Sequence, residues 1–417
     1  MTLGTKHKTT MPFSITTFLL LLCLSSISKV TTSFLIPSPK GLSQTKIAEL
    51  ARKRFDNNDD LPMKGKVAVV TGAAGGIGSE LVKVIHSLGG TVVAMDRDEQ
   101  GLITLEQSLR DNAAAADNDD DDTFIKLVTH HEDLNSVSAS ANEIKARFPT
   151  IDLLINNAGL GYVQDLTPGD PRMISRHGKD LAFTVNYLSH FLLTEKLLPC
   201  LEDAETKGRI VHVTSTFHWQ VDGSEIAPRL ESSSSSPGGE DPLVHRSNPK
   251  EQSSKHIARS YANTKLAQLW HSRSIRVRNC ASVCACPTWA ATGIAGEGAR
   301  DFLQKYAFAV ERCGPGLTSS VNAMLRTEDE LGDAINDGRS FVANCRMLDY
   351  IGGKDVWFTP SPWRDQLSGV VAAVLLFGQK FTHDEFIIQQ TSPESFEDGE
   401  MRERFYQWSL KEVQPWL

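Results

Sequence analysis

The 417-residue sequence has few cysteines and no cysteine pair at the C-x-x-C spacing of a zinc knuckle. This excludes a disulfide-built scaffold, which needs a dense, regular set of cysteines. Cys280, Cys284 and Cys286 do lie together in an apolar run, and their even spacing places them on one face of a strand. Because buried cysteine behaves as a small hydrophobe, we interpret these three as core residues rather than as a metal or redox site. The other cysteines are Cys23, Cys200, Cys313 and Cys345.

An excess of positive charge is also missing, since the formal net charge is −8. A general basic footprint for nucleic acid or anionic lipid is therefore absent, and a small-molecule partner is favoured. The two longest apolar runs, Phe18–Leu24 and Gly369–Phe377, fall short of the ~20 residues that span a bilayer. With 40% hydrophobic and 23% charged residues, the composition is that of a folded globular protein. We interpret Gly369–Phe377 as a core helix or strand.

Acidic residues are lacking from Met1 to Ala48, where the charged residues are lysines. Lysines before the short apolar run Phe18–Leu24 are typical of a signal peptide, expected over residues 1–33. A basic, hydroxyl-containing stretch follows from Phe34, which resembles the transit part of the two-part presequences of algae with complex plastids. We therefore predict a targeting presequence over residues 1–54 and a plastid location. Secretory entry and an uncleaved membrane anchor are the alternatives.

Short apolar runs alternate with amphipathic stretches through most of the remainder. This alternation predicts a doubly wound parallel α/β sheet, the Rossmann fold, in one domain over residues 60–417. Two inserts of low complexity, at about 112–122 and 220–256, are expected to be surface loops, the first favoured over a calcium site. Residues 296–417 are expected to build the substrate side. The predicted strands are 67–70, 91–95, 124–128, 152–155, 209–213 and 281–285.

A glycine-rich turn follows the first predicted strand, in the sequence Thr71-Gly-Ala-Ala-Gly-Gly-Ile-Gly78. Glycines let the backbone approach a pyrophosphate, and the N-terminus of the next helix offers free N–H groups. Asp96 ends the next strand, where a carboxylate binds the ribose hydroxyls of a dinucleotide. Arg97 could instead hold the 2′-phosphate of NADP. The pair leaves NAD or NADP open, with NAD slightly favoured.

These and later motifs resemble the short-chain dehydrogenase/reductase family over residues 64–295. The glycine turn resembles its T-G-x-x-x-G-x-G motif, Asn156-Asn157-Ala158-Gly159 its N-N-A-G, and Tyr261-Ala-Asn-Thr-Lys265 its Y-x-x-x-K. Asp133-Leu134 resembles the acidic pair beside the adenine pocket. Asn186–Thr194 is most similar to the retinol-dehydrogenase-like branch. The cofactor-binding residues that this predicts are Thr71, Gly72, Gly76, Ile77, Gly78, Asp96, Arg97, Asp133, Leu134, Asn157, Ala158, Gly159, Tyr261, Lys265, Pro287 and Thr292.

The helical i, i+4 spacing of Tyr261 and Lys265 places an ammonium beside a phenol, which favours the phenolate and lowers its pKa. Tyr261 is then expected to be the acid/base at a substrate oxygen. The resemblance implies that Ser215 hydrogen-bonds that oxygen and that Asn186 holds a water in a proton relay with Lys265. It also implies that Lys265 binds the nicotinamide ribose. No metal is expected.

Two departures from the family pattern are visible. The serine-rich insert lies between Ser215 and Tyr261, where it would form either a substrate lid or a passive surface loop. Pro287-Thr288 stands where the family usually has Pro-Gly, which alters the backbone freedom of that loop.

The predicted function is an NAD(P)-dependent oxidoreductase acting on an alcohol or carbonyl group of a small, lipophilic substrate. A non-catalytic dinucleotide-binding redox sensor or scaffold is the alternative, and an isomerase or dehydratase that retains the cofactor is a third reading. A homo-oligomer and membrane association through the N-terminal segment stay open, as do the substrate and the reaction direction.

Overall fold

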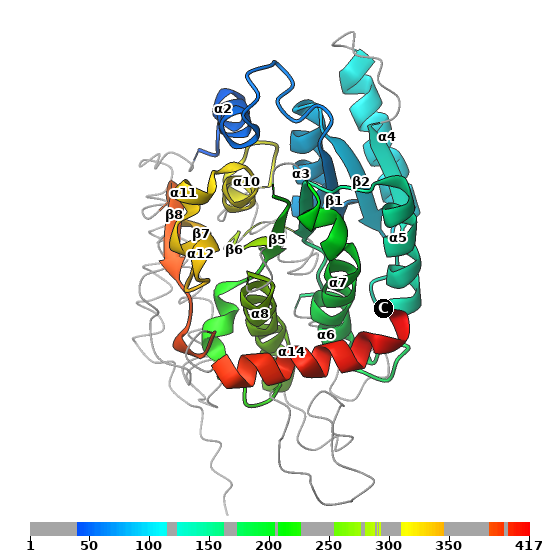
Figure 1. The fold of residues 1–417 in the computed structure, drawn as a ribbon, viewed down its shortest axis with the longest axis vertical. Coiled ribbons are helices and arrows are strands. Elements are labelled where there is room, and N and C mark those ends of the chain that lie inside the picture. The colour runs from blue at the N-terminus through cyan, green and yellow to red at the C-terminus, as the bar shows by residue number, and fades with distance from the viewer. Residues whose placement is uncertain are drawn as a thin grey trace, which may run out of the picture. The chain divides into compact units, whose positions relative to one another are not determined.

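A computed structural model of the chain describes a sheet of eight strands with helices on both faces (Figure 1). The described residues are 40–114, 123–161, 173–204, 207–226, 254–276, 280–287, 290, 292, 310–345, 383–395 and 399–417. The strand order is β3-β2-β1-β4-β5-β6-β7-β8. All neighbouring pairs run parallel except β7 with β8, which are antiparallel. The chain therefore winds outward in both directions from β1, and its switch point lies between β1 and β4.

The predicted doubly wound sheet is confirmed, and each predicted strand is present within a residue of its expected ends. In β1 all residues after the first are buried, which is the pattern of a strand covered on both faces. The strands are β1 (Val67–Thr71), β2 (Thr91–Asp96), β3 (Phe124–Val128), β4 (Leu153–Asn156), β5 (Arg209–Val213), β6 (Ala281–Ala285), β7 (Ser340–Cys345) and β8 (His383–Gln390).

The helices form two layers, because alternate side chains of each strand point to opposite faces. In β1, Ala68 and Val70 belong to one apolar cluster and Val69 to the other. The first cluster packs against α2 (Gln44–Phe55), α3 (Gly76–Ser87), α4 (Glu99–Ala114), α10 (Thr318–Leu325), α11 (Glu328–Leu331) and α12 (Asp333–Asn336). The second packs against α5 (Leu134–Arg147), α6 (Leu181–Phe183), α7 (Ser189–Glu202), α8 (Ser254–Arg276) and α14 (Gly399–Val413).

The folded domain begins at about residue 40, and not at residue 60 as the sequence predicted, because helix α2 is part of its core. Ser43 caps the helix by accepting a hydrogen bond from the Lys46 N–H. Ile47 and Leu50 are buried in the core, where α2 packs on α10. The end of the expected transit segment is therefore folded, because its apolar face is covered by the domain.

The C-terminal helix α14 crosses α8 and ends beside α5 (Figure 1). The Tyr187 hydroxyl meets that of Ser409 at 2.8 Å, and Tyr406 donates to Glu195 at 2.7 Å. Lys196 donates to the carbonyl oxygen of Trp416 at 2.9 Å. The last residues thus complete the second helical layer.

The cysteines expected in the core, Cys280, Cys284 and Cys286, are buried and form no disulfide within the described part of the chain. Burial raises the pKa of Cys284 to about 11, as expected of an inert core thiol. Within the described residues, no helix combines the length and hydropathy that crossing a membrane requires.

Candidate active site

The glycine turn joins β1 to the N-terminus of α3, and its glycines are required for different reasons. Gly72 and Gly76 have φ of +65° and +55°, a region that residues with a Cβ rarely adopt. Gly78 is in the helix, but a Cβ there would lie 2.0 Å from the Gly72 carbonyl oxygen. Ile77 is buried in the core, so only its backbone N–H is available at the helix N-terminus. The turn and helix form the cradle that a phosphate needs.

Thr71 and Asn157 lock the turn onto the end of β4. The Thr71 hydroxyl oxygen accepts hydrogen bonds from the N–H groups of Asn157 and Ala158, both at 2.9 Å. The Asn157 side-chain amide donates back to the Thr71 carbonyl at 2.9 Å and to the Gly72 carbonyl at 3.3 Å. Asn157 therefore holds the turn in shape, and its amide nitrogen is engaged by the protein itself.

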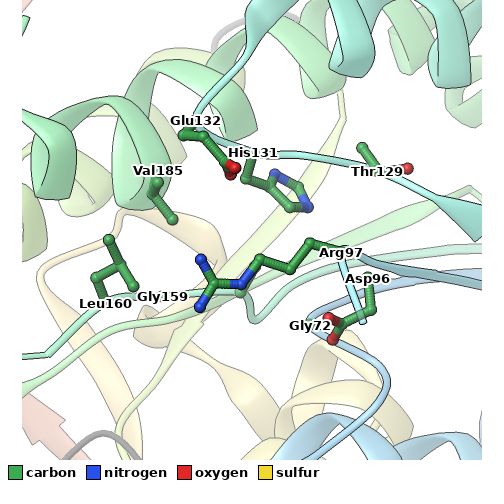
Figure 2. Close-up of a pocket in the computed structure, with 10 residues that line it drawn as sticks. Gly72, Asp96, Arg97, Thr129, His131, Glu132, Gly159, Leu160 and Val185 are labelled. Carbon is green, nitrogen blue, oxygen red and sulfur yellow. The ribbon is translucent and has the colours of Figure 1, made fainter. Parts of the chain in front are cut away.

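A pocket of about 130 Å³ opens beside this turn, at the carboxyl ends of the strands (Figure 2). The Asp96 carboxylate accepts the N–H groups of Ala74 at 2.9 Å and Asp98 at 3.0 Å, which fixes its orientation at the end of β2. Figure 2 shows Arg97 extended across the pocket toward Leu160. The lining residues are Gly72, Asp96, Arg97, Thr129, His131, Glu132, Ala158, Gly159, Leu160 and Val185.

Asp133 and Leu134, expected beside the pocket, are not among its lining residues. Asp133 caps α5 by accepting the Asn135 N–H, and it pairs with Arg176 at 3.2 Å. The Leu134 N–H donates to His177 Nε2 at 3.0 Å. Asp133 and Leu134 therefore fix the start of α5, and it is the two residues before them, His131 and Glu132, that line the pocket.

Tyr261, on α8, hydrogen-bonds through its side chain to Ser215, which follows β5. Ser215 also caps a short 3-10 turn, η3 (Thr216–Gln220), by accepting the Phe217 N–H at 3.3 Å. Phe217 meets the Tyr261 ring edge-on, with centroids 5.7 Å apart. Burial raises the pKa of Tyr261 above its ordinary value, the neighbouring Cys286 thiol adds to this, and the Ser215 hydrogen bond opposes it.

Lys265 lies one helical turn beyond Tyr261, but its ammonium is bonded elsewhere. Its Nζ donates to the Val213 carbonyl at 3.0 Å and lies 5.4 Å from the centroid of the Tyr261 ring. Burial lowers the pKa of Lys265 to about 8, with the thiols of Cys286 and Cys284 opposing the shift. The expected lowering of the Tyr261 pKa by Lys265 is thus absent from this state, because burial dominates both groups.

Asn186 lies in a π-helical turn, η2 (Thr184–Leu188), between α6 and α7. Its side chain accepts the Leu160 N–H at 2.7 Å and donates to the Leu160 carbonyl at 2.9 Å and to Thr264 Oγ1 at 3.2 Å. Its main-chain carbonyl accepts from Gln268 Nε2 at 3.0 Å. The Asn186 side chain therefore joins the loop after β4 to α8. Such π turns are frequent at functional sites.

Two predicted cofactor-binding residues, Pro287 and Thr292, follow β6 in the chain. Pro287 lies two residues beyond the end of β6, and Thr292 lies against the glycine turn, with its Cγ2 3.5 Å from where a Gly76 Cβ would be. Gly159 lies beside Asn186, since a Cβ at Gly159 would be 3.4 Å from Asn186 Oδ1. The structure thus gathers the candidate residues of β1, β2, β4 and β5 with those of α8, but not the side chains of Asp133 and Leu134.

The sequence did not single out five lining residues that lack a recognisable motif: Thr129, His131, Glu132, Leu160 and Val185. Their only signal was position, since Thr129 and His131 follow a strand that ends at this edge of the sheet. Residues 1–39 of the predicted presequence, residues 115–122 and 227–253 of the two inserts, Thr288 and the apolar run 369–377 lie outside the described residues.

Comparison with known proteins agrees with this geometry. Residues 66–221 match the family model for short chain dehydrogenase. Polyprenol dehydrogenase of Mus musculus is 34% identical over 161 residues, which cover 38% of this chain and 44% of that protein. Retinol dehydrogenase 14 of Mus musculus is 32% identical over 160 residues, covering 37% and 46%.

Among solved structures, a short chain dehydrogenase/reductase from Burkholderia phymatum in complex with NAD is 25% identical. It covers 56% of this chain and 69% of that chain, with a TM-score of 0.38. The matched segments span 44% of the polyprenol dehydrogenase, 46% of the retinol dehydrogenase and 62% of an oxidoreductase from Staphylococcus saprophyticus. In its motifs, its fold and these relatives, the chain resembles the short-chain dehydrogenase/reductase family over residues 66–221 and is similar to retinol-dehydrogenase-like members.

Proposed function

We propose that the protein is an NAD(P)-dependent oxidoreductase that interconverts an alcohol and a carbonyl group on a small, lipophilic substrate. The observation that carries this is the hydrogen bond between Tyr261 and Ser215, with Lys265 one turn along α8. A phenol and a hydroxyl converging on one point, beside a glycine turn that opens a helix, is the arrangement that acid/base chemistry at a carbinol oxygen needs.

The described residues fit a dinucleotide. The positive φ of Gly72 and Gly76 lets the backbone turn sharply at the N-terminus of α3, where a pyrophosphate would be held by N–H groups and the helix dipole. Asp96 stands at the end of β2 in the pocket, where it would accept the ribose hydroxyls. When bound, the nicotinamide accepts or supplies the hydride.

The protein's own residues would handle the proton. Tyr261 takes the hydroxyl proton of an alcohol as its carbon loses a hydride, and returns a proton to the oxygen in the reverse direction. Ser215, within hydrogen-bond reach of Tyr261, would hold the substrate oxygen in place. The buried Lys265 would supply positive charge that favours the tyrosinate.

We propose NAD as the preferred cofactor. Two backbone N–H groups hold the Asp96 carboxylate at the pocket, and a fixed anion there would repel a 2′-phosphate. Arg97 is exposed and crosses the same pocket, so its guanidinium is the group that would bind the 2′-phosphate of NADP.

A lipophilic substrate is supported by Phe217, whose ring lies edge-on to Tyr261. An apolar wall beside the acid/base group would bury hydrocarbon next to the reacting carbon. Two relatives are named for the lipophilic alcohols polyprenol and retinol.

For location, we propose that residues 1–39 form a targeting presequence for a complex plastid, supported by the absence of acidic residues and the apolar run before Phe34. A fluorescent fusion of these residues should accumulate in the plastid of such an alga. Retention in the endoplasmic reticulum or secretion would refute it.

The function is tested by following nicotinamide absorbance with a panel of lipophilic alcohols and carbonyls. The wild-type protein should turn over at least one of them, and Tyr261→Phe should lose at least about a hundredfold in kcat while its Kd for the dinucleotide stays within about twofold. Tyr406→Phe is the matched control, because its hydroxyl bonds Glu195 in the C-terminal layer. Dinucleotide binding without turnover by the wild-type protein would favour the sensor reading.

A further inference from the structure

His190, on α7, lies between the two halves of the candidate site and contacts both. Its Nε2 is 2.9 Å from the Thr71 hydroxyl of the glycine turn. Its Nδ1 is 3.0 Å from the main-chain carbonyl oxygen of Asn186, four residues earlier. The side chain is only 1% exposed, so it reaches neither solvent nor the pocket directly.

The partners fix which ring nitrogen carries the proton. A carbonyl oxygen can only accept, so Nδ1 must donate to Asn186 and carries the hydrogen. In the neutral ring, Nε2 is then an acceptor, and the Thr71 hydroxyl donates to it. Burial lowers the pKa of His190 well below its ordinary value, and the His131 ring 5.2 Å away adds to this, so the neutral form is favoured.

On the side of the glycine turn, the hydrogen bond with His190 orients the Thr71 hydroxyl. That hydroxyl donates to His190 at 2.9 Å, a shorter contact than the one to its other acceptor, the Ile155 carbonyl oxygen at 3.3 Å, and its oxygen receives the N–H groups of Asn157 and Ala158. The turn is closely packed on the segment after β4, since a Cβ on Gly72 would lie 2.8 Å from the Ala158 Cα. His190 therefore orients the hydroxyl on which the turn depends.

On the other side, His190 holds the π turn. The Asn186 carbonyl accepts both His190 Nδ1 and Gln268 Nε2, the latter from α8 one turn beyond Thr264. Helix α8 also carries Tyr261 and Lys265. The position of the Asn186 backbone relative to the acid/base helix thus depends on the same imidazole that orients Thr71.

We propose that His190 is a positioning residue that couples the dinucleotide-binding turn, through Thr71, to the proton-transfer side of the site, through Asn186. This inference rests on the proposed function. Its two contacts use different atoms, so the two effects can be separated by substitution.

Two variants each preserve one contact. In His190→Gln, the Oε1 atom reaches the place of Nε2 and can accept from Thr71, but the donor at Nδ1 is lost and the Asn186 carbonyl keeps only the hydrogen bond from Gln268 Nε2. In His190→Asn, the Nδ2 atom takes the place of Nδ1 and can donate to Asn186, but the acceptor at Nε2 is lost and the Thr71 hydroxyl keeps only the longer hydrogen bond to the Ile155 carbonyl, at 3.3 Å. A hydrogen bond lost from a buried partner changes an equilibrium by about tenfold.

The test measures the Kd for NAD(H) and the kcat at saturating dinucleotide in each variant. His190→Gln should keep Kd within about twofold of the wild type and lower kcat about tenfold, and His190→Asn should raise Kd about tenfold with kcat near the wild type. His190→Leu should show both defects. The proposal would be overturned if His190→Gln and His190→Asn changed Kd and kcat equally, or if both variants kept wild-type values. The comparison of these two variants does not depend on whether His190→Leu folds.

His212→Leu is the matched control for losing a buried imidazole, since His212 is 0% exposed and its Nδ1 faces Asn156 at 3.4 Å. It should lower Tm without the Kd and kcat pattern. Nitrogen-15 shifts of His190 provide a readout besides activity: a protonated Nδ1 is expected, and a protonated Nε2 would refute the assignment. A wild-type protein that neither binds nor turns over would instead be a failure of the proposed function.

Discussion

His218 donates from Nδ1 to the carbonyl oxygen of Ser215, 2.7 Å away, directly behind the hydroxyl that faces Tyr261. Its Nε2 accepts the Ser392 N–H at 3.2 Å. One buried ring therefore ties the segment after β5 to the segment after β8. The Ser392 contact requires the neutral imidazole, because a protonated Nε2 can no longer accept the Ser392 hydrogen, whereas Nδ1 can donate to Ser215 in either state.

This arrangement predicts acid lability. Burial lowers the pKa of His218 from an ordinary value of 6.5 to about 4, and the hydrogen bond to the Ser215 carbonyl opposes this shift. Because the folded pKa is depressed, the associated stability is complete above about pH 6.5 and is lost as pH falls toward about 4, amounting to roughly 3 kcal/mol. Tm measured across this range should fall less steeply for His218→Asn than for the wild type. The exposed His130→Asn is the control, and a slope unchanged by His218→Asn would contradict the assignment.

Lys265 predicts an alkaline limit on activity. Its pKa of about 8 means that the ammonium is lost as pH rises through that value. The kcat/KM for the dinucleotide, which reports groups of the free enzyme, should therefore decline above about pH 8. In Lys265→Arg the charge persists, so the decline should disappear even if the overall rate is lower. An identical decline in the arginine variant would assign the limit to another group.

The glycine turn predicts a sharp contrast between two neighbouring positions. Gly78→Ala places a Cβ 2.0 Å from the Gly72 carbonyl, so it should cost about 1–3 kcal/mol in free energy of unfolding and weaken dinucleotide binding at least about tenfold. Gly75→Ala meets nothing within 4 Å and keeps an extended φ of −154°, so its stability should stay within about 0.5 kcal/mol. Chemical denaturation and dinucleotide titration measure both. Equal behaviour of the two variants would mean that the turn is not packed as described.

The cofactor choice predicts opposite effects at adjacent residues. Asp96→Asn removes the anion at the end of β2, so the ratio of Kd for NADP to Kd for NAD should fall about fivefold or more. Arg97→Ala should raise that ratio, since the guanidinium crossing the pocket would be the partner of a 2′-phosphate. Equilibrium titration of both dinucleotides gives the ratios. A wild-type Kd for NADP at or below that for NAD would contradict the proposed preference.

The glycine turn, the strand ends and the Y-x-x-x-K helix were predictable because they depend on local rules. A short apolar run followed by glycines and an amphipathic helix specifies its own geometry, and β1 to β6 lie where the pattern places them. The strands β7 and β8 were not predicted. Polar side chains interrupt both strands, so neither has the period or the long apolar run that identifies a strand from sequence, and among the described residues β8 (His383–Gln390) is paired with β7 alone.

The sequence by itself determined the fold class, the family resemblance and the residue types of the candidate site, because backbone conformation and hydrophobic period are encoded over a few neighbouring positions. Only the tertiary structure decided which partner each side chain takes. It turned Asp133 toward Arg176, brought His131 to the pocket and placed His190 between Thr71 and Asn186. It also joined residues 40–55 to the domain through the packing of α2 on α10. Such contacts link positions far apart in the chain, and burial, rather than spacing, sets the pKa of Tyr261 and Lys265.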